Sequence, residues 1–197
     1  MHGHLIAFEG LDQSGKQTQA ERLHARLGAL GHRTELVSFP DYTTPIGIEL
    51  ATALRGGREY SPEVMQLLYI ANRFEKKPDL TRMLAEGCLV VSDRFLSSSI
   101  AYGEAFGLDP TWLADIQRHL PRPSMTVLLD IAPETAVARK ASDRDRYERD
   151  LALQKRVRES YRRLARQEGW LVLDGERSRD EVAEDVFRET TTRLALR

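Results

Sequence analysis

The chain has little cysteine and no long apolar run. Its 197 residues include one cysteine, Cys88, which excludes an internal disulfide and is expected to be a small core residue. No apolar run is long enough to span a bilayer, and the first residues lack the pattern of a signal peptide. These absences favour a reducing, cytoplasmic setting and argue against a membrane protein.

An excess of charge of either sign is also absent. The lysines and arginines (29) nearly balance the aspartates and glutamates (30), which gives a net charge of −1 at pH 7. This balance argues against a broad basic surface for nucleic acid or anionic lipid, so local basic clusters are interpreted as sites. The length suits one α/β domain, and no internal repeat or low-complexity linker divides residues 1–197.

The most specific motif present is a glycine-rich turn. Gly10, Gly15 and Lys16 fit the pattern G-x-x-x-x-G-K, between an apolar run and a helical pattern. Glycines let backbone N–H groups converge on phosphate oxygens, and the helix and the lysine add positive charge. The alternative is a strand–helix turn with a surface lysine, which would not require this ordered context. The candidate phosphate loop, residues 8–18, contains these nucleotide-binding candidates: Gly10, Leu11, Asp12, Gln13, Ser14, Gly15, Lys16, Gln17 and Thr18.

The loop departs from the usual pattern after its lysine. That position normally holds Ser or Thr, whose hydroxyl binds Mg²⁺, but here it holds Gln17. The amide oxygen of Gln17 is a candidate metal ligand, directly or through water. Thr18 is the alternative ligand if the loop is shifted by one residue.

Five short apolar runs alternate with longer helical patterns. They lie at 5–9, 34–39, 88–92, 125–130 and 170–174, and they predict a parallel sheet covered by helices on both faces. Helical patterns at 62–72, 79–85 and 136–165 are expected to cover a substrate site. Asp93, Asp130 and Asp174 stand at strand ends, where parallel sheets bind ligands.

Two pairs of side chains suggest a second site. Asp93 suits Mg²⁺ or its bound water, and Arg94 beside it suits a phosphate; the alternative is an ion pair that caps a helix. Tyr69 and Arg73, four residues apart, share one helix face. They can stack a nucleobase and donate to its carbonyl edge, although a simple packing pair is the alternative.

Several motifs in a fixed order resemble the thymidylate kinase family. They are Phe8-Glu9-Gly10-Leu11-Asp12 with Gly15-Lys16, Phe39-Pro40, Ala71-Asn72-Arg73, Asp93-Arg94-Phe95 with Ser98 and Ala101-Tyr102, and Leu128-Leu129-Asp130. The resemblance implies a three-layer α/β P-loop kinase fold with a five-stranded parallel sheet in the order 2-3-1-4-5 and a mobile lid. It also implies a homodimer that uses ATP and Mg²⁺ to convert dTMP to dTDP in dTTP synthesis.

The resemblance implies a role for each matching residue. Lys16 would contact the transferring phosphoryl group, Arg94 would hold the dTMP phosphate, and Asp93 would organise Mg²⁺. The implied contacts to dTMP are Asp12 to the 3′-hydroxyl, Tyr69 stacked on thymine, Arg73 to thymine O4, Ser98 and Tyr102 along the base and sugar, and Phe39 with Tyr69 near the 5-methyl group.

The sequence also differs from the family's usual pattern. Asp41-Tyr42 replaces an arginine near the acceptor phosphate, and Gly103 replaces a glutamine common in bacterial members. The phosphate loop carries no arginine, which resembles the class that keeps its catalytic arginine in the lid. The lid is expected at about residues 139–150, with Arg144 and Arg146 as the first catalytic candidates and Arg139 behind them.

Two other functions remain compatible with the sequence. Another nucleoside monophosphate kinase would need different base-edge partners from Tyr69 and Arg73. A non-catalytic nucleotide-binding protein is the alternative from another class, although the Asn-Lys-x-Asp stretch of guanine-reading GTPases is absent from the sequence.

Overall fold

The computed structural model describes residues 3–139 and 150–196 and contains one parallel sheet. Its order, β2-β3-β1-β4-β5, confirms the order that the family resemblance implies. Every neighbouring pair runs parallel, as in a sheet whose strands are joined by crossover helices. The strands are β1 (His4–Glu9), β2 (Thr34–Ser38), β3 (Leu89–Asp93), β4 (Met125–Asp130) and β5 (Leu171–Asp174).

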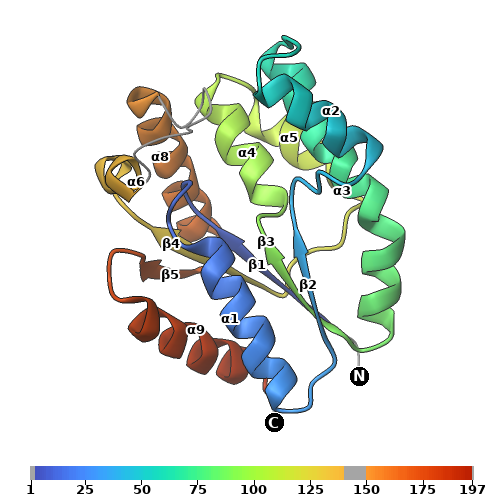
Figure 1. The fold of residues 1–197 in the computed structure, drawn as a ribbon, viewed down its shortest axis with the longest axis vertical. Helices are drawn as coiled ribbons and strands as arrows, with labels where there is room; N and C mark the ends of the chain where they lie inside the picture. The colour runs from blue at the N-terminus through green and yellow to red at the C-terminus, as the bar shows by residue number, and fades with distance from the viewer. Residues whose placement is uncertain (1–2, 140–149, 197) are drawn as a thin grey trace.

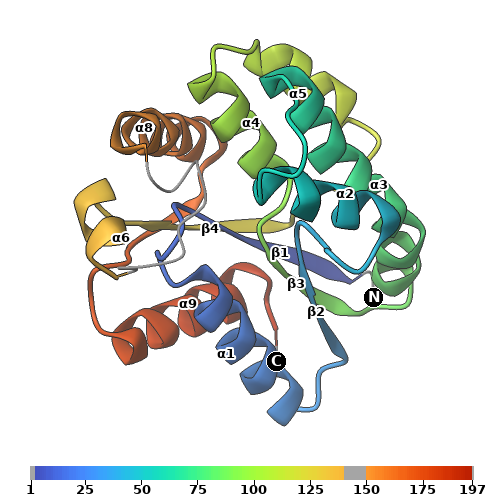
Figure 2. The same ribbon diagram turned by 45° about the horizontal axis from the view of Figure 1, so that its top comes forward.

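The helices form a layer on each face of the sheet. They are α1 (Lys16–Ala29), α2 (Pro45–Leu54), α3 (Pro62–Ala85), α4 (Leu96–Ala105), α5 (Pro110–Ile116), α6 (Pro133–Arg139), α8 (Leu151–Glu168) and α9 (Arg179–Arg193). Helices α1 and α9 cover one face, and α3, α4 and α8 cover the other (Figures 1 and 2). The expected three-layer α/β architecture is therefore confirmed.

Each face buries its own apolar cluster. Phe8 of β1 packs with Leu27 of α1 and Val186 of α9 on one side. On the other side, Val90 of β3 packs with Leu80 of α3. The central strands are buried on both faces, which explains why they read as continuous apolar runs in the sequence.

The segments expected to be helical are helical, but the helix boundaries differ from the expected ranges. The segments 62–72 and 79–85 belong to one helix, α3, which continues through Pro78. A proline inside a helix removes one backbone hydrogen bond, but Ile70 and Leu80 are buried on either side of it and hold α3 together. The pattern at 136–165 corresponds to α6 and α8, and Arg144 and Arg146 lie outside the described residues.

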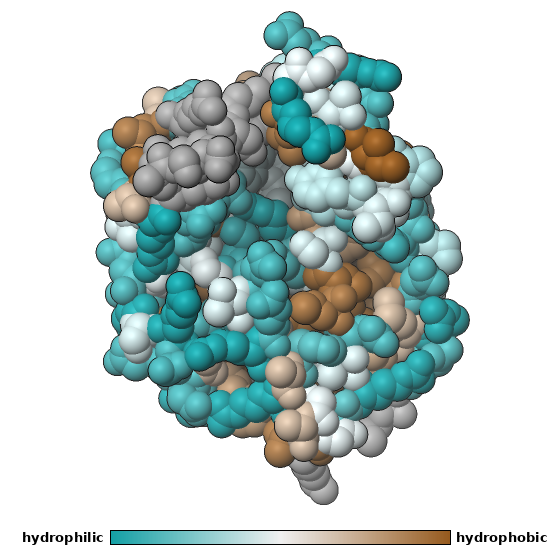
Figure 3. Space-filling model, in the orientation of Figure 1, coloured by the Kyte–Doolittle hydropathy of each residue, from teal (hydrophilic) through white to brown (hydrophobic). Residues whose placement is uncertain are grey.

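Most of the surface is polar. In Figure 3, apolar residues gather beside the edge strand β2 and over α2. Leu36 of β2 and Ile48 of α2 are among the exposed large apolar residues. Among the helices of the described segments, none combines the length and apolar character needed to cross a membrane.

Candidate active site

The phosphate loop joins the end of β1 to the start of α1. Gly10 has φ +142°, and a Cβ there would lie 2.5 Å from the carbonyl oxygen of Leu129. Gly15 has φ +95°, in the left-handed region, immediately before the first residue of α1. Side chains rarely tolerate either condition, so the backbone geometry requires glycine at both positions.

A cavity of about 570 Å³ lies along this loop, and we call it the loop cavity. Lys16 lies in its wall, and its Nζ donates to the carbonyl oxygen of Leu11 at 2.7 Å. Burial, reinforced by the nearby charge of Arg94, lowers the pKa of Lys16 to about 8. The amine is therefore mostly charged at pH 7, but it is sensitive to any anion that enters the cavity.

The carboxylate of Asp93 also lines the loop cavity, at the end of β3. Its Oδ1 is buried and has no hydrogen-bond partner among the described residues. Buried carboxylate oxygens are normally satisfied, so an orphaned one marks a place for a cation or a bound water. Gln17 is exposed, and its amide nitrogen donates to Glu21 at 2.9 Å on the outer surface of α1.

Asp12 and Arg94 form an ion pair that borders two cavities. Arg94 Nη2 donates to Asp12, and its Nη1 lies 3.3 Å from the carbonyl oxygen of Gly10. Burial opposes ionisation of Asp12, but the charges of Arg94 and Lys16 prevail and lower its pKa to about 2. Arg94 has φ +63°, which turns the chain sharply between β3 and α4.

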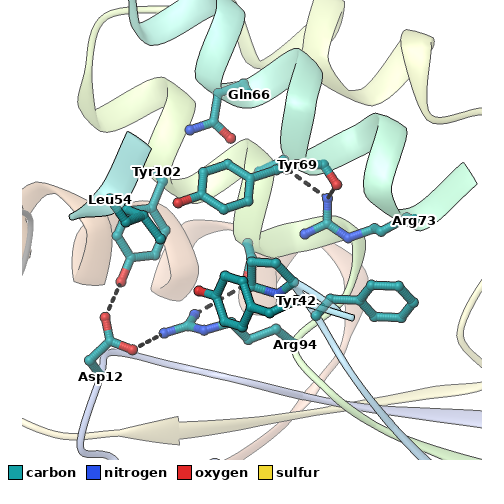
Figure 4. A pocket seen from close by; sticks show the side chains of 12 residues that line it. Asp12, Tyr42, Leu54, Gln66, Tyr69, Arg73, Arg94 and Tyr102 are labelled. Carbon is teal, nitrogen blue, oxygen red and sulfur yellow. Dashed lines mark hydrogen bonds and ion pairs between the residues drawn. The ribbon is translucent and has the colours of Figure 1, made fainter. Parts of the chain in front are cut away.

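The second cavity, which we call the aromatic cavity, holds about 100 Å³ (Figure 4). Asp12 and Arg94 line both this cavity and the loop cavity. Tyr102 donates to Asp12 at 3.1 Å, and its ring centroid lies 5.5 Å from the Arg94 guanidinium carbon. The lining residues are Asp12, Phe39, Pro40, Tyr42, Leu54, Gln66, Tyr69, Arg73, Arg94, Ser98, Ser99 and Tyr102.

Arg73 is fixed inside this cavity. Its side chain donates to Ser99 Oγ at 2.8 Å and to the carbonyl oxygen of Tyr69 at 3.2 Å. The guanidinium carbon lies 5.9 Å from the ring centroid of Phe39. Burial lowers the pKa of Arg73 to about 10, so it remains charged at pH 7. A fixed, buried cation beside aromatic rings is suited to a flat ligand with a carbonyl edge.

The loop between β2 and α2 closes one wall of the aromatic cavity. Asn72 of α3 accepts from the backbone N–H of Asp41 at 2.8 Å and donates to its carbonyl oxygen at 3.1 Å. The Asp41 carboxylate pairs with Lys76 at 2.9 Å. Asp41 is thus held against α3, and its neighbours Pro40 and Tyr42 line the cavity.

A buried polar network around Glu9 contacts the Asp12–Arg94 pair through Arg94. Glu9, at the end of β1, accepts from the backbone N–H groups of Phe95 and Ser98 at 3.0 and 3.2 Å. It therefore caps the start of α4, whose own N-cap residue, Phe95, makes no side-chain capping bond. Ser98 Oγ and the Tyr161 hydroxyl donate to Glu9 at 2.7 and 3.0 Å. Ser98 therefore contacts both this network and, at 3.1 Å, Arg94 Nη1.

The structure brings together most residues that the sequence singled out. Asp12, Phe39, Tyr69, Arg73, Arg94, Ser98 and Tyr102 all line the aromatic cavity. The phosphate-loop residues from Asp12 to Thr18 line the loop cavity with Asp93 and Arg139.

Other lining residues carried little sequence signal. Leu54, Gln66 and Ser99 line the aromatic cavity but belong to no motif. The one available signal was spacing, since Gln66 stands three residues before Tyr69 and seven before Arg73, on the same helix face.

The turn after β5 is a further part of the loop cavity that the sequence did not indicate. Arg177, Ser178 and Arg179 line it. Arg139 connects this turn to the phosphate loop, because its guanidinium donates to the carbonyl oxygens of Gln13 and Gly175 at 3.0 and 2.9 Å.

Comparisons with known proteins agree on one family. The family model described as thymidylate kinase matches residues 8–186. The chain is 34% identical to human thymidylate kinase over 189 residues, covering 93% of this chain and 88% of that one. It is 39% identical to a probable thymidylate kinase of Pyrobaculum calidifontis over 184 residues, covering 92% of each chain.

A solved structure shows the same likeness in three dimensions. The thymidylate kinase of Candida albicans superposes with a TM-score of 0.86 at 28% identity, covering 98% of this chain and 93% of that one. The agreement of the family model, the relatives and the fold means that the chain belongs to the thymidylate kinase family.

Proposed function

We propose that this protein transfers the γ-phosphoryl group of ATP to dTMP, giving dTDP and ADP, with Mg²⁺ as cofactor. The observation that carries the proposal is the Asp12–Arg94 pair, which borders both the loop cavity and the aromatic cavity. A donor phosphate in one cavity and an acceptor phosphate in the other would meet at Arg94. Membership of the thymidylate kinase family supports dTMP as the acceptor.

On the donor side, the phosphate loop holds ATP. The backbone N–H groups of the loop and the start of α1 face the phosphates, and Lys16 neutralises the transferring group. Arg139 holds the loop against the turn at Gly175 and so fixes the shape of the loop cavity.

On the acceptor side, the aromatic cavity holds dTMP. Tyr69 and Phe39 flank thymine, and Arg73 donates to its O4. Asp12 accepts from the sugar 3′-hydroxyl beside the Tyr102 ring, and Arg94 grips the phosphate. Ser98 Oγ accepts a hydrogen bond from Arg94 Nη1 and so orients the guanidinium group.

Asp93 is the proposed metal residue because its buried Oδ1 is unsatisfied within the described chain and lies in the wall of the loop cavity. Gln17 is a second candidate, because it also lines the loop cavity and its bond to Glu21 uses Nε2 and not the candidate ligand atom Oε1. Mg²⁺, when bound, would neutralise charge on the ATP phosphates.

The chemistry requires positioning and charge neutralisation, with no covalent intermediate on the protein. The attacking oxygen belongs to the dTMP phosphate, which is ionised at neutral pH, so a strong general base is not needed. Lys16 and Arg94 hold the two phosphates in place for direct transfer. Closure of a lid over the loop cavity would exclude water, whose attack would waste ATP.

The lid, proposed at about residues 139–150, supplies a further arginine to the developing charge. Arg144 and Arg146 are the first candidates, with Arg139 as the third. Replacing the correct one by alanine should lower kcat by roughly 10³-fold while dTMP binding persists. Three single variants with kcat within a few fold of the parent protein would contradict a lid arginine.

We also propose a cytoplasmic homodimer formed through helix faces. Ile48, Val64 and Leu67 leave apolar side chains exposed on α2 and α3, where a second copy would cover them. The buried free thiol of Cys88 suits a reducing compartment. Sedimentation equilibrium should give twice the chain mass of 22.4 kDa; a mass of one chain would contradict the dimer.

A substrate panel tests the activity. ADP formation from ATP and Mg²⁺ is followed with dTMP, dUMP, dCMP, dGMP, AMP and GMP in parallel. The proposal predicts fast turnover with dTMP, slower turnover with dUMP and almost none with the others. Preference for another monophosphate would indicate a different nucleoside monophosphate kinase, and no turnover at all would favour a non-catalytic nucleotide-binding protein.

A further inference from the structure

Gln66 of α3 is a buried amide in the wall of the aromatic cavity that no motif accounts for. Its side chain is 2% exposed, and its Oε1 has no hydrogen-bond partner within the described residues. Leaving such a buried acceptor without a hydrogen bond costs free energy. Gln66 lines the cavity, and its buried acceptor has no partner among the described residues, which points to a ligand that donates a hydrogen bond to this amide.

The position of Gln66 relates it to the other base-contacting residues. Gln66, Tyr69 and Arg73 are spaced by three and four residues, so they share one face of α3. In Figure 4, the Gln66 amide lies above the Tyr69 ring, and the Arg73 guanidinium lies to its right, beside the Tyr69 backbone. Arg73 Nε is also buried without a partner in the described part of the chain. The cavity thus offers one unsatisfied acceptor and one unsatisfied donor from the same helix.

Gly103 of α4 explains how Gln66 fits. A Cβ at position 103 would lie 2.3 Å from Leu113 Cδ1 and 3.4 Å from Gln66 Cγ. The space that a side chain at 103 would need is therefore taken by Leu113, and the stem of Gln66 lies at ordinary contact distance. An amide reaches this wall from α3, while α4 contributes no side chain at this point.

A pyrimidine with two carbonyl groups presents a complementary edge. Thymine offers the N3–H donor between the acceptors O4 and O2. Cytosine offers the opposite at two of these positions, because its N3 accepts and its amino group donates. An acceptor at Gln66 Oε1 together with donors on Arg73 matches the first pattern and opposes the second.

We propose that Gln66 is a specificity-determining residue for the acceptor base. Its Oε1 accepts from thymine N3–H, its Nε2 donates to the neighbouring carbonyl, and Arg73 donates to O4. This assignment rests on the proposed dTMP kinase function. Discrimination against dCMP then depends on two side chains, Gln66 and Arg73, on one face of α3.

The test compares Gln66→Met with Gln117→Met. Gln117 is another buried glutamine with an unpartnered Oε1 in the described chain, but it lies outside the aromatic cavity and bonds the carbonyl oxygens of Leu96 and Leu113. Q66M should raise KM for dTMP and weaken dTMP binding, measured by calorimetry, by roughly tenfold or more, while kcat changes little. The ratio of kcat/KM for dTMP to that for dCMP should also fall. Q117M should leave that ratio unchanged.

A modified substrate supplies a second readout. The parent protein should bind N3-methyl-dTMP at least about tenfold more weakly than dTMP, and Q66M should lose most of this difference. Because the Gln66 Oε1 has no hydrogen-bond partner to lose among the described residues, Q66M should fold; Gln66→Leu serves as a second variant.

The failure of this inference can be distinguished from the failure of the function. If the parent protein prefers dTMP and both Gln66 variants keep its full preference over dCMP and N3-methyl-dTMP, Gln66 does not read the base. If the parent protein itself does not turn over dTMP, the proposed function is wrong, and this inference fails with it.

Discussion

Three aspartates end neighbouring parts of the same sheet, but their surroundings differ. Asp130 is held by Arg158 and Arg162, with the closest contacts at 2.7 Å. Asp174 accepts from the backbone N–H of Glu176 at 2.8 Å. Asp93 alone among these three keeps a buried, unpartnered oxygen in the described structure. The first two carboxylates stabilise the fold, and the third is available for a ligand.

This difference predicts the effect of Asp93→Asn. The variant should need a higher Mg²⁺ concentration for half-maximal activity and should show a lower kcat, because a neutral amide binds the cation more weakly. Its thermal unfolding temperature should not fall, since Oδ1 has no protein partner to lose in the described chain. The control, Asp174→Asn, removes a turn hydrogen bond and should leave the Mg²⁺ dependence unchanged. An unaltered Mg²⁺ dependence in Asp93→Asn would exclude the metal role.

The lowered pKa of Lys16 predicts pH-dependent nucleotide binding. Burial brings this pKa to about 8 in the free protein, so the amine loses its charge as the pH rises through that value. A bound polyphosphate favours the charged amine, so ATP affinity should fall above pH 8 by up to about tenfold per pH unit. Calorimetry from about pH 7 to about pH 9.5 measures this dependence. Lys16→Met should bind weakly at every pH; the same slope in that variant would rule out Lys16 as its source.

Site residues that belong to a sequence motif were easier to predict than those that belong to none. Asp12 and Arg94 were recognisable because each belongs to a short motif with a chemical reason for its residue types. Gln66 was not, because a single glutamine in a helical pattern resembles a surface residue. Its burial depends on Gly103 and Leu113, which lie on other helices. Only the packed structure brings these residues together.

At the scale of secondary-structure elements, the Tyr161 hydroxyl of α8 donates a hydrogen bond to Glu9 at the end of β1. Tyr161 is buried and donates to Glu9 at 3.0 Å, and its oxygen lies 2.9 Å from Ser98 Oγ. Helices α8 and α4 also pack together in the core, where Val157 and Ile100 belong to one cluster. The position of α4, and with it Ser98, therefore depends on this contact.

Tyr161→Phe tests that contact. The change removes a donor to a buried carboxylate and should lower the free energy of unfolding by about 1–3 kcal/mol, measured by urea denaturation. Tyr60→Phe is the matched control, because Tyr60 donates to Glu49 at 2.7 Å in a partly exposed position, where water replaces the lost bond. Equal effects of the two changes would show that the Glu9 network contributes no special stability.

Element boundaries were harder to predict than element types. The five strands were readable because parallel strands buried on both faces give short apolar runs. The helical patterns at 62–72 and 79–85 are parts of one helix, α3, which continues through Pro78, a residue type that usually signals a break. Packing of residues on both sides of Pro78 overrides that signal, and no local pattern carries this information.

At the scale of the whole molecule, the sheet places two chemically different cavities side by side. The ends of β1 and β3 supply Asp12, Asp93 and Arg94 between them. The loop cavity is lined by the phosphate loop and several charged side chains, and the aromatic cavity by aromatic rings and two arginines, Arg73 and Arg94. The order of motifs indicated both sites, but the sequence did not show that they share the Asp12–Arg94 pair. That shared pair makes direct transfer between two bound nucleotides possible.

The most direct test follows the phosphorus atom itself. The protein is incubated with dTMP, Mg²⁺ and ATP labelled in its γ-phosphate, and the products are separated. The account predicts that the label appears in dTDP in step with ADP formation, with little in inorganic phosphate. Label in inorganic phosphate alone, or ADP without labelled dTDP, would contradict transfer between the two cavities.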